Sequence, residues 1–317
     1  MKKYFILVIA LFFASDVVGQ SQDTGTGMDF LNIGPSSRIL SLNEATTATP
    51  TGSSAIYTNP ALLILETSSS VDLNYTLWVA DVNNQFASVN LLQDSYAIGF
   101  GVYNSRSDGF QARDQPGPSQ GDFSISYLSL AASAAYKIGS FSAGITAHYL
   151  REEVFQFRAN GYAITTGVTG SFLDERVRIG TVLQNIGEME ELDNVSTELP
   201  TTFKAGVMAN LIEFTTPGEN DLPVLLSLHA DYIVPLEDKP TSDFLDQNEG
   251  DNFLAVAVSA DVADLFYLQT GYKWGPTERP FSFGTGVFID PIRVNYALVP
   301  FRTGYGTSHS IGLQFYF

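Results

Sequence analysis

The sequence predicts an all-β fold, a transmembrane antiparallel β-barrel of about 14 strands with an N-terminal plug segment. Apolar residues alternate with small or polar ones over segments of roughly eight to twelve residues. The connections between these segments alternate between short and long, and the chain ends on an apolar strand. Only 16% of the 317 residues are charged and 13% are aromatic, which suits strands that face something other than water.

The alternating segments run from residue 70 to the end of the chain. In "VRIGTVLQ", the residues Val177, Ile179 and Leu183 share one face, and in "IRVNYALV" the residues Val294 and Tyr296 do the same. Tilted strands of nine to eleven residues cross a bilayer, and closing the sheet pairs every backbone group. The predicted strands are 70–79, 84–92, 95–103, 123–136, 141–150, 161–171, 176–184, 201–211, 224–233, 252–260, 265–273, 281–289, 292–299 and 308–317.

The lengths of the connections indicate a membrane barrel. The short connections are 93–94, 137–140, 174–175, 261–264 and 290–291, and the long ones are 104–122, 151–160, 185–200, 234–251, 274–280 and 300–307. Two connections depart from this rhythm, because 80–83 is short and 212–223 is long. Short turns on one rim and long loops on the other are typical of bacterial outer-membrane barrels, with both ends of the sheet on the periplasmic side. A soluble double β-sandwich explains the alternation but not this rhythm.

The last ten residues, "SHSIGLQFYF", form an apolar strand with no obvious soluble partner. An unpaired apolar strand at a chain end is an aggregation hazard. We therefore expect this strand to pair with the first strand and to face lipid. Phe315 and Phe317 at its end resemble the signal that outer-membrane barrels present to the barrel insertion machinery.

The N-terminus carries the pattern of a secretory signal peptide. Lys2 and Lys3 precede an apolar run from Tyr4 to Ala14, and Val17-Val18-Gly19 offers the small residues of a cleavage site. This run is too short to span about 30 Å of hydrocarbon. The predicted organisation is therefore a signal peptide at 1–19, a plug or hatch segment at 20–69 and a barrel at 70–317, in the outer membrane of a Gram-negative bacterium.

Residues 33–66 are too long and too patterned for a linker. In "TNPALLILE", Asn59 can cap a short helix and Pro60 suits its first position, so the leucines that follow need burial. In a barrel, the dry space for them is the lumen. The lumen-facing residues Gly167, Gly180, Gly206, Gly284, Gly286, Gly312 and Ala297 leave room for an inserted segment. The alternative is that these glycines only permit strand bending.

This segment resembles the N-terminal motif of the PorV/PorQ family, relatives of FadL-type β-barrels. The matching residues are Gly34, Ser37-Arg38, Leu42, Ala45, Ser54-Ala55, Tyr57 and Asn59-Pro60-Ala61. The chain departs from the family with Asn43-Glu44 in place of a glycine pair, and with Thr49-Pro50-Thr51-Gly52 in place of an acidic turn. Downstream, "LQNIG" from Leu183 and "LPTTFKAG" from Leu199 are also similar to the family.

The resemblance implies a non-enzymatic component of type IX secretion. Its partners would be cargo proteins with C-terminal secretion signal domains and other secretion-system subunits, contacted through the loops 104–122, 185–200 and 234–251. The alternative is a FadL-like transporter of hydrophobic small molecules. That reading requires an apolar lumen pocket, whereas the lumen positions Arg178, Arg293, Asn295 and Gln314 are polar.

The chemistry of the chain argues against an enzyme. It has no cysteine, and its imidazoles, His148, His229 and His309, lie within or beside predicted strands. The carboxylate pairs Glu152-Glu153 and Glu190-Glu191 lie on predicted loops without the shaped cleft that acid–base chemistry needs. A net charge of −18 argues against nucleic acid. We predict no catalytic residue, cofactor or metal, and outer-membrane lipid as the surroundings of the barrel.

Overall fold

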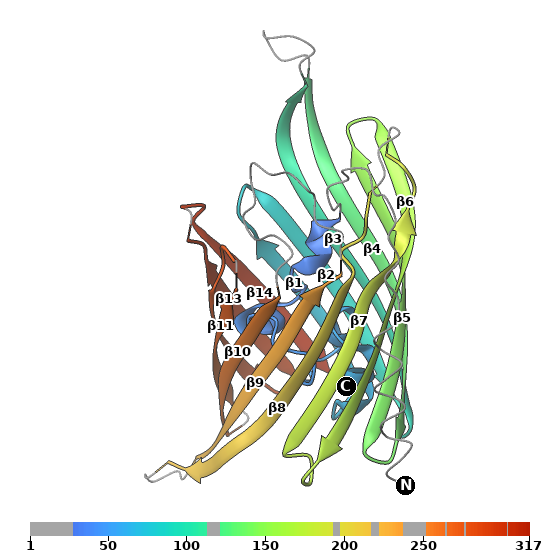
Figure 1. Cartoon of the computed structure of the whole chain (residues 1–317). Helices are drawn as coiled ribbons and strands as arrows, with labels where there is room; N and C mark the ends of the chain where they lie inside the picture. The colour runs from blue at the N-terminus through green and yellow to red at the C-terminus, as the bar shows by residue number, and fades with distance from the viewer. Residues whose placement is uncertain are drawn as a thin grey trace.

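The computed structural model describes residues 28–112, 121–192, 197–216, 222–236, 252–263, 265–275, 277–302 and 304–317. These residues form a closed barrel of 14 antiparallel strands in which each strand pairs with its neighbours in the sequence and β1 pairs with β14 (Figure 1). The strands are β1 (Ser70–Leu77), β2 (Val82–Leu92), β3 (Tyr96–Ala112), β4 (Gly121–Ile138), β5 (Phe141–Val154), β6 (Phe157–Phe172), β7 (Val177–Met189), β8 (Thr202–Thr215), β9 (Pro223–Pro235), β10 (Phe253–Val262), β11 (Phe266–Trp274), β12 (Phe281–Ile289), β13 (Ile292–Pro300) and β14 (Thr307–Tyr316).

The predicted fold class is confirmed, and each predicted strand corresponds to one observed strand. The barrel closes where β1 meets β14, from Ser70 opposite Tyr316 to Leu77 opposite His309. The terminal strand therefore has the partner that its apolar sequence requires. Among the described residues, no helix is long and apolar enough to cross a membrane.

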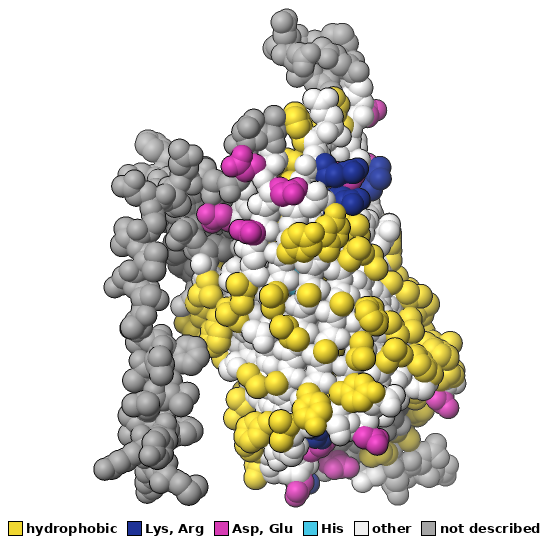
Figure 2. Space-filling view, turned by 90° about the vertical axis from the view of Figure 1, so that its right-hand side faces the viewer, with side chains coloured by type: hydrophobic (Ala, Val, Ile, Leu, Met, Phe, Trp, Pro, Cys, Tyr) yellow, Lys and Arg dark blue, Asp and Glu magenta, His cyan; other side chains and the backbone are white. Residues whose placement is uncertain are grey.

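The wall has one apolar and one polar face, because side chains alternate along each strand. On β14, Ile311, Leu313 and Phe315 are exposed on the outside, whereas Ser310 and Gln314 are buried in the lumen. Exposed apolar residues lie on the outside of the strands, and on the face shown in Figure 2 they form a broad apolar band. A lipid-facing exterior of this kind is what a membrane-spanning barrel presents.

Several predicted connections are shorter in the structure. In the predicted long loop 104–122, β3 and β4 stay paired up to Ala112 opposite Gly121. The predicted long loop 151–160 is a tight turn at residues 155–156, because β5 and β6 stay paired up to Val154 opposite Phe157. In the long 212–223 connection, β8 and β9 continue their ladder to Thr215 opposite Pro223. The β8–β9 hairpin projects beyond the end of the barrel opposite to the tall β3–β4 hairpin (Figure 1). Strand pairing thus continues where the apolar pattern has already ended.

Residues 28–69, which we call the plug segment, run inside the barrel (Figure 1). Their short helices are η2 (Asp29–Asn32), α2 (Ser37–Ser41), η3 (Ser54–Tyr57) and η4 (Pro60–Leu65). The core of the protein lies between this segment and the wall, with Leu42, Ile56 and Leu62 fully buried. The predicted signal peptide and its cleavage site lie outside the described residues.

Wall glycines make room for the plug segment. A Cβ atom at Gly180 would overlap the carbonyl oxygen of Thr47, one at Gly284 would overlap Ser41, and one at Gly167 would overlap Asn59. At Gly286 and Gly312, an added Cβ would first meet side chains of the wall itself. At Gly206, it would first meet the Asp231 carboxylate of the wall and then Thr47. Gly167, Gly180 and Gly284, half of the six predicted lumen glycines, therefore allow close approach of the plug segment.

Candidate functional site in the barrel lumen

We divide the plug segment into a tip (residues 28–33) and a body (residues 34–66). The body folds around Asn59, whose side-chain oxygen accepts from Ala61 N and caps η4. The Asn59 amide nitrogen donates to Thr47 O at 2.7 Å and to Thr169 Oγ1 on β6 at 3.2 Å. One side chain therefore caps a helix, joins two parts of the body and holds both against the wall.

Asp231 on β9 is the main acceptor for the middle of the body. Its Oδ2 atom accepts from Thr46 N, Thr47 N and Thr47 Oγ1 at 2.9, 2.8 and 2.6 Å. Asp231 is 1% exposed, so these donors satisfy a carboxylate that is shielded from water. Nearby, Thr49 Oγ1 lies 2.7 Å from His229 Nδ1. A buried acceptor of this kind fixes the chain that donates to it.

A second buried carboxylate, Asp72 on β1, holds the turn of the body at residues 51–54. It accepts from Ser53 Oγ at 2.5 Å and from Ser54 N at 3.3 Å. Glu66 closes the same turn by accepting from Gly52 N at 2.6 Å. Burial raises the pKa of the Glu66 carboxyl, and Arg38 and the Gly52 N–H oppose that rise. The turn is therefore fixed by acidic groups on both sides.

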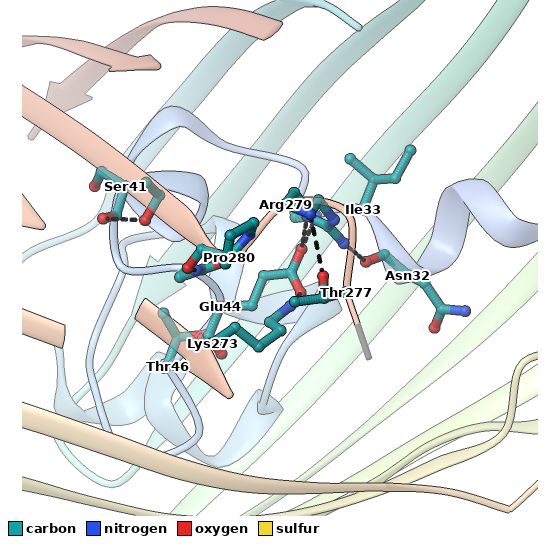
Figure 3. A network of polar contacts seen from close by, with 12 residues as sticks. Asn32, Ile33, Ser41, Glu44, Thr46, Lys273, Thr277, Arg279 and Pro280 are labelled. Atoms are coloured by element: carbon teal, nitrogen blue, oxygen red, sulfur yellow. Dashed lines mark hydrogen bonds and ion pairs between the residues drawn. The ribbon is translucent and has the colours of Figure 1, made fainter. Parts of the chain in front are cut away.

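Glu44 joins the body to β11 and to the chain that precedes β12 (Figure 3). Its carboxylate accepts from Lys273 Nζ on β11 at 2.9 Å and from Arg279 Nη1 at 2.7 Å. Burial alone would raise the pKa of Glu44, but Arg279 and Lys273 outweigh burial and hold that pKa well below its usual range. Arg279 also donates to Asn32 O in the tip at 3.1 Å.

The backbone at Asn43 and Glu44 adopts a conformation that usually favours glycine. Both residues have positive φ, 50° and 66°, a conformation that glycine adopts freely and that asparagine tolerates better than most residues. The PorV/PorQ motif that this segment resembles has a glycine pair at these two positions. In this chain, the ionic contacts of Glu44 offset the conformational cost of a side chain at that position.

The tip lies in an aromatic part of the lumen. We call the residues Phe30, Tyr57, Phe86, Tyr103 and Tyr127 the aromatic cluster. The Phe30 ring lies 5.1 Å from the Tyr103 ring and stacks on the Tyr127 ring at 5.6 Å. The Tyr57 ring meets those of Phe86 and Tyr103 edge-on at 5.6 and 5.7 Å. Met28, Leu150, Ala163 and Leu199 complete this apolar core.

This cluster lies in the half of the lumen that the sequence analysis predicts to be extracellular, since Tyr103, in the middle of β3, is the cross-strand partner of Phe86, which lies in the first half of β2. Phe30 and Met28 are 4% and 1% exposed, and each contributes about 1.5–3 kcal/mol by burial. Stacked and edge-on rings are the environment that aromatic hydrocarbons favour. The cluster can thus hold an apolar molecule, and the tip of the chain occupies that position.

The seam between β7 and β8 is irregular next to the cluster. Their pairing ends at Gln184 opposite Thr202, and the β6–β7 register shifts at Ile164 and Thr166, where Asn185 has a φ of 58°. The chain before β8 covers this end of the seam, with Asn185 Nδ2 donating to Pro200 O at 3.1 Å. Leu199 from this chain packs into the apolar core. The motifs "LQNIG" and "LPTTFKAG" thus meet here.

The residues of the predicted plug motif lie within one continuous interior. Gly34 N donates to Glu44 Oε1 at 3.3 Å, Ser54 accepts from Ser36, and Ala55 and Ala61 are fully buried. Tyr57 donates to Ser129 O at 3.0 Å, and Pro60 packs against Gly144. Arg38 lies over the Tyr267 ring at 5.9 Å.

Phe315 and Phe317 are remote from this interior. Their rings lie 6.1 Å apart on the outer face of the barrel, consistent with the position expected of an assembly signal. Within the described residues, no three His, Asp or Glu side chains gather as metal ligands.

The sequence analysis missed the aromatic cluster in the lumen. It assigned small and polar residues to the lumen, and it did not place Tyr103, Tyr127 and Phe30 together. The signal available was the alternation of β3, which puts Tyr103 on the same face as Gly99 and Gly101. Glu44 was recognised only as a departure from a motif.

Comparison with solved structures places this architecture among FadL-type outer-membrane barrels. The Ralstonia pickettii toluene transporter TbuX is 15% identical, with a TM-score of 0.58 over 90% of this chain and 98% of that one. A CymD monoaromatic hydrocarbon channel is 13% identical, with a TM-score of 0.59 over 92% and 99%. A Pseudomonas aeruginosa FadL homologue is 12% identical, with a TM-score of 0.51 over 88% and 96%.

These likenesses show the fold. No protein-family model matches the sequence, and no curated protein sequence matches it. The resemblance to PorV and PorQ therefore finds no support in the comparisons. The relationship to FadL-type barrels, which formed part of the same resemblance, agrees with the shared fold.

Proposed function

We propose that this barrel conducts small hydrophobic molecules, with aromatic hydrocarbons as the best-fitting class, across the outer membrane. The observation that carries the proposal is the aromatic cluster in the extracellular half of the lumen, where the tip places Phe30 between Tyr103 and Tyr127. A benzene-like ring could take the place of the Phe30 ring with the same contacts. Two of the barrels with this fold are described as a toluene transporter and a monoaromatic hydrocarbon channel.

In this proposal the tip is a movable cover. Its polar contacts with the wall include Tyr103 Oη to Ile33 O and Arg279 Nη2 to Asn32 O. When a ligand displaces Phe30, the adjacent seam between β7 and β8 offers the shortest way out of the core. This end of the seam is covered by the loop that carries Leu199 and not by a paired strand. The body, which fills the middle of the lumen, keeps water and ions from following.

The test is uptake of radiolabelled toluene by porin-deficient cells that carry the barrel in their outer membrane. Ala163→Phe adds a ring inside the apolar core, where Ala163 is 3% exposed, and we expect uptake to fall at least fivefold. Phe288→Ala is the matched control, because Phe288 faces the lumen near the periplasmic end and contacts Tyr316. Uptake equal to that of cells without the barrel, or unchanged by Ala163→Phe, would refute the proposal.

A second candidate function is a docking platform for secreted cargo, the role implied by the resemblance to PorV and PorQ. The density of hydrogen bonds between the body and the wall favours it, because a fixed plug suits a scaffold better than a pore. The β3–β4 hairpin rises beyond the other strands (Figure 1) and would offer a surface for such a partner. The partners would be proteins with C-terminal secretion signal domains and other secretion-system subunits.

A pull-down from detergent-solubilised outer membrane distinguishes the two functions. Secretion-system subunits or cargo signal domains in the eluate would support the platform. A barrel that elutes alone, from cells in which it also speeds toluene uptake, would support the channel.

A further inference from the structure

The basic side chains on the outer wall gather at one place. Among the described strands, the outward-facing lysines and arginines are Arg106 on β3, Arg151 on β5 and Arg158 on β6. The other basic residues of these strands, Lys137, Arg178, Lys204, Lys273 and Arg293, follow the lumenal alternation. In a chain with a net charge of −18, this concentration on neighbouring strands is a distinct surface feature.

The register places these arginines at nearly the same height. Arg106 is opposite Ser126 on β4, Ser126 is opposite Glu153 on β5, and Glu153 is opposite Arg158 on β6. Arg151 lies one outward position below Glu153. We call Arg106, Arg151 and Arg158 the basic patch. Figure 2 shows Lys and Arg side chains gathered just above the apolar band on this face of the barrel.

The depth of the patch matches the headgroup layer of the outer leaflet. On β5, the outward face begins with Phe141 at the periplasmic end and reaches Tyr149 eight residues later. At about 3.3 Å per residue and a tilt of about 40°, those residues span about 20 Å, close to the roughly 25 Å apolar band of such barrels. Tyr149 and Tyr162 form the aromatic girdle here, with ring centroids 5.6 Å apart. Arg151 comes directly above the girdle.

Local contacts orient the arginines without using all of their donors. Arg151 lies over the Tyr149 ring at 5.7 Å and donates from Nη2 to the Tyr149 hydroxyl at 3.2 Å. Its Nε atom is buried and has no hydrogen-bond partner. Arg158 pairs with Glu153 at 2.8 Å, whereas Arg151 is 3.9 Å from the same carboxylate. One carboxylate thus serves two guanidinium groups.

We propose that the basic patch binds the phosphate group of a phosphorylated lipid in the outer leaflet. Arg151 and Arg158 would donate to the phosphate oxygens, as arginine forks commonly do. The apolar wall beneath Tyr149 and Tyr162 would pack against the acyl chains. Arg106 pairs with Asp108 at 2.8 Å and lies at the edge of the basic patch, where it adds positive charge.

The partner is a lipid headgroup and not a free anion, because the patch stands at the boundary of the apolar band. An exposed arginine pair alone is a weak anion site in water, where such interactions are worth about 1 kcal/mol or less. A headgroup that is held at this depth by its acyl chains raises the local phosphate concentration. The patch therefore gains its selectivity from position as well as from charge.

The experiment measures lipid retained by the purified, folded barrel in detergent, using native mass spectrometry. The probe is lipid A with both phosphates, compared with dephosphorylated lipid A and with phosphatidylethanolamine. The variant Arg151→Gln/Arg158→Gln should retain at least tenfold less phosphorylated lipid A. The control Lys137→Gln/Arg176→Gln removes two basic residues at the opposite rim and should retain as much as the wild type. Folding of each variant is checked by heat-modifiable gel migration.

A second variant tests the same site in the opposite direction. Glu153→Gln removes the carboxylate that competes for Arg158 and Arg151, so retention of phosphorylated lipid A should increase severalfold. Three results would each overturn the proposal. They are retention of phosphorylated lipid A by the double arginine variant equal to that of the wild type, retention of dephosphorylated lipid A equal to that of the phosphorylated form, and displacement of the bound lipid by millimolar inorganic phosphate.

Discussion

The body and the tip of the plug segment fill the same lumen but are held in different ways. The body donates and accepts hydrogen bonds along its length, and buried carboxylates at Asp72 and Asp231 receive several donors each. The tip is held mainly by the burial of Met28 and Phe30 in the aromatic cluster. Hydrogen bonds in a shielded interior are directional and cooperative, whereas apolar contacts are not.

This difference assigns the two parts different roles. Moving the body would leave buried donors and acceptors unpaired, at about 1–3 kcal/mol for each group. Moving the tip exposes apolar rings, and a hydrophobic ligand that enters the cluster offsets that loss. In the function that we propose, the tip is therefore the part that an apolar ligand displaces, and the body is the permanent seal.

The largest effect is expected from Asp231→Ala, which breaks the body. Removal of this carboxylate leaves Thr46 N, Thr47 N and Thr47 Oγ1 without their acceptor, and stability should fall by about 3 kcal/mol or more. Limited proteolysis should then cleave the plug segment, and the unfolding temperature in detergent should drop. Asp231→Asn keeps one acceptor oxygen and should therefore lose less stability than Asp231→Ala. Equal stability of the wild type and Asp231→Ala would show that these bonds do not hold the body.

The next largest effect is expected from Glu44, whose ionisation makes the stability of the protein sensitive to acid. Arg279 and Lys273 lower the pKa of Glu44 in the folded protein. The stability that ionised Glu44 contributes is therefore fully present above the ordinary glutamate pKa of about 4.3 and is lost as the pH falls below that value. Glu44→Gln should lower the unfolding temperature at pH 7 and lessen its fall between about pH 4.5 and pH 3. Parallel pH profiles for the wild type and the variant would contradict this account.

A smaller effect is expected from Phe30→Ala, which loosens the tip alone. A buried phenylalanine in a rigid core costs about 3–5 kcal/mol on truncation, but the tip can detach without disturbing the wall. The unfolding temperature of the barrel should therefore change little, while protease sensitivity before residue 34 should rise severalfold. A large loss of barrel stability would mean that the tip belongs to the permanent seal.

The smallest effect on the plug segment is expected from deletion of Phe317. This residue is 59% exposed on the outer face and, in our proposal, serves the insertion machinery. The folded yield in cells should fall about twofold or more, while the folded fraction should keep the proteolysis pattern of the wild type. An unchanged folded yield would count against the assembly role.

The wall was predictable from the sequence because one face of every strand is apolar. The cap at Asn59 was predictable because capping is local. The continuation of β5 and β6 past Arg151 and Arg158 was not, since these segments lie above the apolar band and carry no apolar alternation. Their pairing comes from the ladder below them.

The lumen site was not predictable because its members come together only when the barrel closes. Glu44 and its partner Lys273 are 229 positions apart, and no local pattern links them. Phe30 meets Tyr127 only because α2 and the turns of the body fix where the tip lies. The prediction of a polar lumen came from considering a few strands one at a time. It overlooked the wall rings of Phe86, Tyr103 and Tyr127 and the rings of Phe30 and Tyr57 in the plug segment.

Hydrogen–deuterium exchange of the folded barrel, with and without saturating toluene, tests the division between tip and body most directly. The account predicts faster exchange in residues 28–33 when toluene is present and unchanged protection in residues 36–65. Unchanged exchange in the tip, or loss of protection throughout the body, would contradict it.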